Sequence, residues 1–323
     1  MTRLRTLWTK LWGSYSIGLV VLIVGLVLAV LTPNFMRLDN LLNVLANASI
    51  VGIVGLGMTL AIAAGMFDLS VGSTAAFASC ITLSLVPEYG VLPSVLAGLV
   101  AGALIGLCNG LIITELRVPA FIATMAMMTI VRGAALIFTN GRDIYLFGFP
   151  AYKVLTRRVF GTVHMPVILV LVILMILILM IKHTRFGRHI LAVGSNLPAT
   201  KRAGVRASLV IWGVFAIVGA TAALTGLIVS AQVLTANARL NFGLELSAIA
   251  VVVIGGTALD GGRANLIGTL LGSLLVAMIN NGLNLLNVPI FYQQLTVGLL
   301  LLAALALSVR RGFSPTAYLR RQA

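Results

Sequence analysis

Residues 165–181 read MPVILVLVILMILILMI, without a single charged side chain. The apolar residues do not alternate with polar ones, which favours a helix over a strand with one polar face. A hydrocarbon core about 30 Å thick needs ~20 such residues to cross it as a helix. Because lipid offers the backbone no hydrogen-bond partner, a helix is the structure that satisfies it there. The stretch therefore predicts a membrane-spanning helix.

The composition extends this prediction to the rest of the chain. Of the 323 residues, 60% are hydrophobic and 9% are charged, and the mean hydropathy is +1.12. A soluble domain has about 45–50% apolar and about 25% charged residues. The polar interruptions at 140–164 and 182–207 are too short to hold a folded core. We therefore expect an all-α, polytopic transmembrane bundle, with residues 1–323 forming one domain.

Ten apolar stretches are long enough to be predicted spans. They cover approximately residues 15–32, 41–64, 70–86, 91–113, 119–139, 165–181, 208–231, 243–259, 265–286 and 290–309. Basic residues concentrate in the cytoplasmic loops of membrane proteins. With the N-terminus inside, the inner segments hold fifteen Lys and Arg, the outer segments hold six, and Arg132 lies within a span. This bias predicts that both termini are cytoplasmic.

The formal net charge of +15 comes from these span-flanking residues. No basic face interleaved with aromatic residues exists, so we expect no nucleic-acid partner. Cys80 and Cys108 fall inside predicted spans, which argues against a disulfide framework. The basic N-terminus before the apolar run at 15–31 resembles a signal peptide, but this run is longer than the usual ~7–15 residues. We expect an uncleaved first span.

Glycines recur at every fourth position in two predicted spans. They are Gly98, Gly102, Gly106 and Gly110 in the fourth span, and Gly268 and Gly272 in the ninth. Small residues at this spacing let helix backbones approach closely in lipid. We expect close static packing along these lines, and a glycine-lined sliding surface is the alternative.

The sequence lacks the motifs of common catalytic and metal sites. It contains no G-x-x-x-x-G-K-[ST] and no H-E-x-x-H, and its three histidines show no metal-ligand spacing. Seven acidic residues leave a proton or sodium relay almost nothing to use. We expect no catalytic residue, no metal and no cofactor in this chain. Uphill transport would then need energy from another chain.

Two charged residues lie in the outer half of predicted spans, namely Arg132 and Glu245. Ionisable side chains are costly in a membrane and mark functional sites. We predict an Arg132–Glu245 contact that acts as an outer gate or a polar clamp. A structural ion pair, or snorkelling of the arginine toward the headgroups, is the alternative.

Further polar side chains lie inside or beside the spans. Asp68, within GMFDLSVG (65–72), can cap the third span, and the alternative is a gating or substrate-facing acid. Amides occur in the fourth and ninth spans at Asn109, Asn280, Asn281 and Asn284. Such amides bridge helices with a gain of roughly 0.6–2 kcal/mol. The alternative is that they line a path for a hydroxyl-rich solute.

The loop 182–207 carries the signals of a short helix. Asn196 can cap it, Pro198 is tolerated in its first turn, and Gly204 is a natural terminator. We expect about two turns of helix, too short to span the membrane and presented to the cytosol, where a partner docks. A plain basic turn is the alternative.

Several motifs occur in a fixed order along the chain. They are GMFDLSVGS (65–73), VPAFIAT (118–124), RG (132–133) with TNG (139–141), HTRFGR (183–188), GSNLPATKRAGV (194–205), AVVVIGGTALDGGR (250–263) and NNGLNLL (280–286). In this combination the chain resembles the monosaccharide ABC-importer permeases of the ribose, arabinose and xylose type. The resemblance runs from about residue 15 to 310, and such a permease should have about ten spans.

The resemblance implies a permease subunit that moves a sugar, in particular a pentose, across the bacterial inner membrane by alternating access. It implies a homodimer or a permease pair, cytoplasmic ATPase subunits that hold ATP and Mg²⁺, and a periplasmic sugar-binding protein. The coupling helix that contacts the ATPase would include Gly194, Asn196, Ala199, Lys201, Arg202 and Gly204. The chain departs from the family pattern at Leu197, Pro198 and Arg202, so we expect an interface tuned to one ATPase partner.

Other functions stay open on the residues alone. A permease of the same type could move a polyol, a signalling furanose or a branched amino acid. An ion-driven secondary carrier should show intramembrane acids and unwound helices in matching halves, and the sequence is poor in both. No nucleophile–base pair or metal set supports a membrane enzyme.

Overall fold

The computed structural model describes residues 2–159 and 161–310. Its helices are α1 (Thr2–Leu31), α2 (Leu38–Ala63), α3 (Val71–Tyr89), α4 (Val91–Glu115), α5 (Ala120–Thr139), α6 (Met165–His183), α7 (Arg185–Ser195), α8 (Leu197–Arg202), α9 (Ala207–Val233), α10 (Leu244–Ile254), α11 (Leu266–Leu285) and α12 (Ile290–Arg310). Seven of them, α2 to α6, α9 and α11, are long and apolar enough to cross a membrane, and Ile17–Leu31, Leu244–Ile254 and Phe291–Ala303 are shorter apolar helices. These ten segments confirm the all-helical, polytopic prediction.

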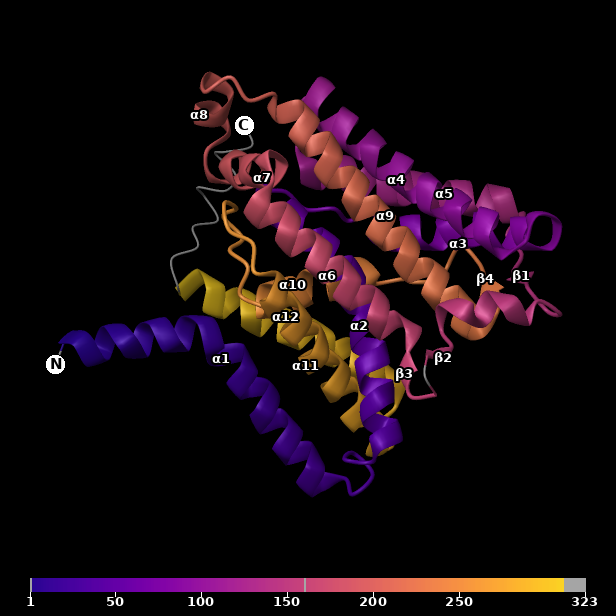
Figure 1. Cartoon of the computed structure of the whole chain (residues 1–323). Helices are drawn as coiled ribbons and strands as arrows, with labels where there is room; N and C mark the ends of the chain where they lie inside the picture. The colour runs from indigo at the N-terminus through magenta and orange to yellow at the C-terminus, as the bar shows by residue number, and fades with distance from the viewer. Residues whose placement is uncertain (1, 160, 311–323) are drawn as a thin grey trace.

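The small non-helical elements gather at one end of the bundle. β1 (Ile144–Tyr145) pairs with β4 (Thr235–Ala236), and β2 (Arg158–Val159) pairs with β3 (Val163–His164), both antiparallel. A 3₁₀ helix, Pro150–Leu155, lies between β1 and β2. Figure 1 shows these strands at the end of the bundle away from α7 and α8, while the start of α1 and the end of α12 lie toward α7 and α8.

The hydrophobic core is built around α2 and α9. Leu56 and Met58 of α2 and Phe215 of α9 are fully buried in one cluster. α6 lies at the periphery, where Met175, near its middle, is 64% exposed. A helix that is apolar on all sides yet exposes its side chains suits contact with lipid. The stretch that predicted the fold is therefore a boundary helix, which joins the core along one face through Val170 and Leu177.

The glycine line of α4 packs directly against α9, beside which it runs in Figure 1. A Cβ built on Gly102 would lie 2.6 Å from the Gly219 carbonyl oxygen, and a Cβ on Gly106 would overlap the Phe215 carbonyl. A Cβ on Gly110 would lie 2.8 Å from the Cα of Trp212. The two backbones are thus in contact, which is the close packing that the spacing predicts.

The substitution Gly106→Ala should destabilise the protein because its methyl group has no room against α9. We expect a loss of about 1–3 kcal/mol, the range for overpacking, seen as a lower thermal unfolding midpoint in detergent. Gly298→Ala in α12 is the matched control, because nothing lies within 4 Å of a Cβ there. Equal midpoints for both variants would contradict the close α4–α9 packing.

The predicted eighth span, 243–259, is wrong in its length. α10 has 11 residues, or about 16 Å at 1.5 Å per residue, which is half of the hydrocarbon thickness. Non-helical residues 237–243 lead into it from β4, and it ends at Gly255 and Gly256, of which Gly256 has φ +80°. The crossing is made partly by non-helical backbone. Such backbone is tolerated at membrane depth only where protein surrounds it or it lines a cavity.

α1 begins at Thr2, and its apolar part, Ile17–Leu31, coincides with the predicted first span at 15–32. α7 was not predicted. It fills the first half of the loop 182–207 and precedes the predicted short helix.

Candidate functional site

The helix α8 forms where the sequence predicts one. The Asn196 side chain accepts the N–H of Ala199 at 3.0 Å, and Pro198 lies in the first turn. Gly204 follows the helix with φ +80°. The cap, the start signal and the stop signal are therefore all in their expected places. The two-turn helix is confirmed as a structure.

α7 precedes it and anchors α8 to the bundle. The hydroxyl of Thr184 caps α7 by accepting the N–H of Gly187 at 3.0 Å. Ile190 and Val193 are buried in the main core, whereas Arg188 is exposed. This amphipathic pattern after a threonine cap is the signal that could have predicted α7.

At the end of α7, three motifs that are distant in sequence meet in what we call the glycine junction: Gly65, Gly194, Gly261 and Gly262. The N–H of Gly262 donates to the carbonyl of Ala63 at 2.8 Å. A Cβ on Gly194 would overlap that same carbonyl and lie 2.6 Å from the Gly262 nitrogen. A Cβ on Gly261 would lie 3.0 Å from the Cα atoms of both Gly194 and Gly65. The junction therefore admits only glycine at Gly194.

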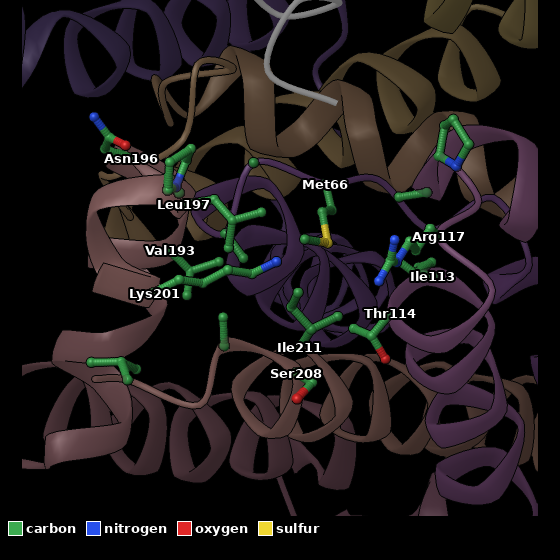
Figure 2. Close-up of a pocket in the computed structure, with 18 of the residues that line it drawn as sticks. Met66, Ile113, Thr114, Arg117, Val193, Asn196, Leu197, Lys201, Ser208 and Ile211 are labelled. Atoms are coloured by element: carbon green, nitrogen blue, oxygen red, sulfur yellow. The ribbon is translucent and has the colours of Figure 1, made fainter. Parts of the chain in front are cut away.

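A cavity of about 900 Å³ lies beside α8, between the α4–α5 loop and the start of α9. Figure 2 shows Lys201 pointing into it from α8, Arg117 on the opposite side, and Asn196 pointing away. Arg202 is exposed and is not among the lining residues. Of the two basic coupling candidates, Lys201 therefore faces the bundle and Arg202 faces outward.

Asp68 lies in a buried turn between α2 and α3 and is 1% exposed. It accepts the N–H of Ser70 at 2.8 Å and the Ser70 hydroxyl at 2.6 Å. The Asn109 amide donates to Ser70 Oγ at 2.8 Å and lies 3.3 Å from the Asp68 carboxylate. The predicted capping role is wrong in detail: Ser70 is the N-cap residue, and Asp68 holds the turn before it.

The two variants Asp68→Asn and Asp68→Ala separate the structural role of Asp68 from a charged one. Asparagine keeps an acceptor for Ser70, so we expect nearly unchanged thermal stability and transport. Alanine leaves buried donors unpaired, at a cost of about 1–3 kcal/mol. Transport lost in Asp68→Asn at unchanged stability would show instead that the path needs the ionised acid.

The amides of α11 bridge helices. Asn281 exchanges two hydrogen bonds, of 2.8 and 2.9 Å, with Asn40 of α2. Asn284 accepts the Gln293 amide of α12 at 2.7 Å. Asn280 has a buried Oδ1 with no hydrogen-bond partner in the described part of the chain. For Asn281 and Asn284 the structure therefore shows the bridging arrangement.

Arg132 forms no ion pair within 4 Å with Glu245, which was the alternative to the predicted gate or clamp contact. Its Nη1 donates to the carbonyls of Ala238 and, at 3.2 Å, of Leu240. These carbonyls belong to the non-helical approach to α10 and need donors. Among the side chains that the structure describes, the one ion pair within 4 Å joins Arg158 to Asp39.

Arg132 and Glu245 are nevertheless close, because both face Gly72 at the start of α3. A Cβ built on Gly72 would overlap Glu245 Oε2 and lie 3.6 Å from Arg132 Nη2. The Glu245 carboxylate thus lies at the N-terminal ends of two helices, α3 and its own α10, where negative charge is favourable. The structure brings the two predicted residues to one place, with Gly72 between them.

The described residues contain no group of three or more His, Cys, Asp or Glu side chains placed to hold a metal ion. The polar groups found here form turns, bridges and a charged cluster, and none forms a nucleophile–base pair.

Apolar helices around buried polar turns, with a small helical projection at one end, define a multi-pass membrane protein of the permease class. The chain belongs to the family described as "Branched-chain amino acid transport system / permease component", which matches residues 40–305. The protein is thus the non-catalytic permease component of an ABC transporter. In such a transporter a separate ATPase subunit binds ATP, and a binding protein is a further partner.

Known proteins resemble the chain over nearly its full length. The ribose import permease protein RbsC of Escherichia coli K12 is 37% identical, with 93% of this chain and 95% of the relative covered. The L-arabinose permease protein AraH of Azospirillum brasilense is 32% identical, with 94% and 89% covered. The D-allose permease protein AlsC of E. coli K12 is 31% identical, with 92% and 91% covered. No solved structure matches.

Proposed function

We propose that this chain is the permease subunit of an ATP-driven importer that moves a monosaccharide, specifically a pentose, across the bacterial inner membrane. The observation that carries the proposal is the near full-length similarity to permeases named for ribose, L-arabinose and D-allose. Ribose and arabinose are pentoses, and allose is a hexose. A soluble, periplasmic binding protein would deliver the sugar to the permease.

The orientation we propose places both termini, α7 and α8 in the cytoplasm. The excess of basic residues in the corresponding loops supports it. So does the arrangement in Figure 1, where the start of α1 and the end of α12 lie toward the side of α7 and α8. The strands then lie on the periplasmic side.

We place the translocation path along the face of α5 and α10, against a second copy of the chain. Arg132 is only partly buried, and Phe242 beside it is 79% exposed. A guanidinium at this depth is costly against lipid, so such residues face a protein interior or a water-filled path. The other polar candidates already bond to neighbouring side chains, so we propose that they stabilise the helices around the path and do not contact the solute. They are Asp68, Asn109, Asn281 and Asn284.

We assign coupling to α8 and its anchor, including Gly194, Asn196, Ala199, Lys201, Arg202 and Gly204. The helix is short, exposed and basic in its last turn, and the glycine junction connects its base to α2 and to the α10–α11 loop. A force applied to α8 by an ATPase would therefore reach the membrane helices through direct backbone contact.

Charge reversal on α8 should uncouple ATP hydrolysis from uptake. In vesicles containing the complete transporter, Arg202→Glu should lower sugar uptake about tenfold or more, because it places the wrong charge at the ATPase contact. Lys201→Glu should also lower sugar uptake, because it places a negative charge on the side of α8 that faces the cavity. Arg188→Glu on α7 is the control with the same change of charge. Unchanged uptake per ATP in both α8 variants would contradict the coupling role.

The transport function is tested with the complete transporter in vesicles, together with its own ATPase and binding protein. With ATP on the ATPase side, we expect accumulation of a radiolabelled pentose from a panel of ribose, arabinose, xylose and the hexose allose. The same panel should include a polyol and a branched amino acid, since the family description names the latter. Accumulation of the amino acid alone would contradict the sugar proposal.

A further inference from the structure

The residues 237–243, which we call the entry segment of α10, are tied to α5 by the side chain of Arg132. Arg132 of α5 donates to the carbonyls of Ala238 and Leu240. Its guanidinium also stands 5.9 Å from the centre of the Phe242 ring, within the range of a cation–π contact. Within the entry segment, the hydrogen bonds are those of short turns, such as Leu240 N–H to the Asn237 carbonyl at 3.2 Å, and others join it to α10. Loss of Arg132 would therefore free the entry segment from α5 while leaving it attached to α10.

Two buried side-chain atoms, one in the entry segment and one in the first turn of α10, have no hydrogen-bond partner in the described structure. Glu245 is 8% exposed, and its Oε2 has no hydrogen-bond partner among the residues described. The amide nitrogen of Asn241 is likewise buried and unpaired there. Both residues lie against Gly72, because a Cβ on Gly72 would overlap Glu245 Oε2 and lie 2.8 Å from the Asn241 carbonyl oxygen. Buried polar groups are normally paired, so two such atoms at one place point to a missing partner.

The chemistry of this cluster suits a sugar. A hydroxyl group donates and accepts, so neighbouring hydroxyls can satisfy one spare acceptor, Glu245 Oε2, and one spare donor, Asn241 Nδ2. The apolar face of a sugar ring can lie on an aromatic ring, and the Phe242 ring is 79% exposed directly beside them. An acceptor, a donor and an aromatic surface thus converge where the chain is broken halfway through its crossing.

We infer that Asn241, Phe242 and Glu245 form a sugar-contact site within the translocation path, and that Arg132 is the latch that keeps it closed. The inference rests on the proposed function and deepens it. When Arg132 holds the entry segment, the two polar atoms are covered. When the entry segment moves, they become available to sugar hydroxyls, and the sugar passes a polar contact in the middle of the membrane.

The first test measures uptake by the complete transporter carrying Glu245→Ala. We expect uptake to fall about tenfold to a hundredfold, the range for one lost hydrogen bond to a charged group. ATP hydrolysis stimulated by the loaded binding protein should remain, because the coupling helix is untouched. Leu246→Ala, in the same turn of α10 with a side chain that is 52% exposed, is the control and should transport normally. Wild-type uptake in Glu245→Ala would overturn the site.

The second test measures the latch and does not depend on ATP. Vesicles with Arg132→Gln should leak preloaded sugar several times faster than wild type. Phe242→Cys is made in a Cys108→Ser background, which removes the exposed native thiol. The new cysteine should react with a charged methanethiosulfonate reagent, and added sugar should slow this reaction. The reagent needs a thiolate in contact with water, so Met175→Cys on α6 should stay unlabelled.

The outcomes distinguish failure of the proposed transport function from failure of the proposed sugar-contact site and latch. If the wild-type complex imports no sugar, the proposed function itself fails. If it imports sugar while Arg132→Gln does not leak and Phe242→Cys is inert, the latch and site are overturned and the function stands. If Arg132→Gln does not fold, the labelling of Phe242→Cys alone decides: protection by sugar supports the site, and no reaction overturns it.

Discussion

Lipid offers no hydrogen bond to a protein backbone, and this constraint governs every break in the bundle. Each break is satisfied by a particular side chain. Asp68 binds the turn before α3, and Arg132 binds the carbonyls of the segment before α10. Asn265 donates to the carbonyl of Gly255 at 2.8 Å and accepts the N–H of Gly268 at 3.0 Å, which closes the α10–α11 loop. The side chains of Asp68, Arg132 and Asn265 therefore bond to backbone groups at points where regular helices stop.

Under the proposed function, these breaks are the points at which the permease would move. Continuous helices packed along glycines, as α4 and α9 are, form a rigid frame. α10, in contrast, is a half-length helix between two non-helical segments. One of these segments reaches the glycine junction through Gly262, and the other is held by Arg132. Through the glycine junction, α7 and α8 are connected to α10, and α10 begins at the charged cluster around Gly72. A displacement of α7 and α8 would therefore be transmitted to this cluster through α10.

The sequence predicted well what depends on local pattern. Continuous apolar runs identified the spans, and Asn196, Pro198 and Gly204 identified α8 residue by residue. It predicted less well what depends on tertiary contacts. The predicted eighth span began at 243, next to the observed start of α10 at Leu244, but hydropathy did not show that the helix ends at Ile254, before Gly255 and Gly256. The sequence correctly predicted that Arg132 and Glu245 lie close together. It could not predict that the carbonyls of Ala238 and Leu240 bind the guanidinium, because this depends on how the entry segment packs beside α5.

The central claim is that this chain is a passage without an energy source of its own. The most direct measurement uses vesicles that contain the purified chain alone and supplies, in turn, ATP, a sodium gradient and a pH gradient. We expect no ATP hydrolysis above background and no sugar accumulation under any of the three conditions, with accumulation restored by adding the ATPase and binding protein. Sugar concentrated by the chain alone under an ion or pH gradient would contradict the claim.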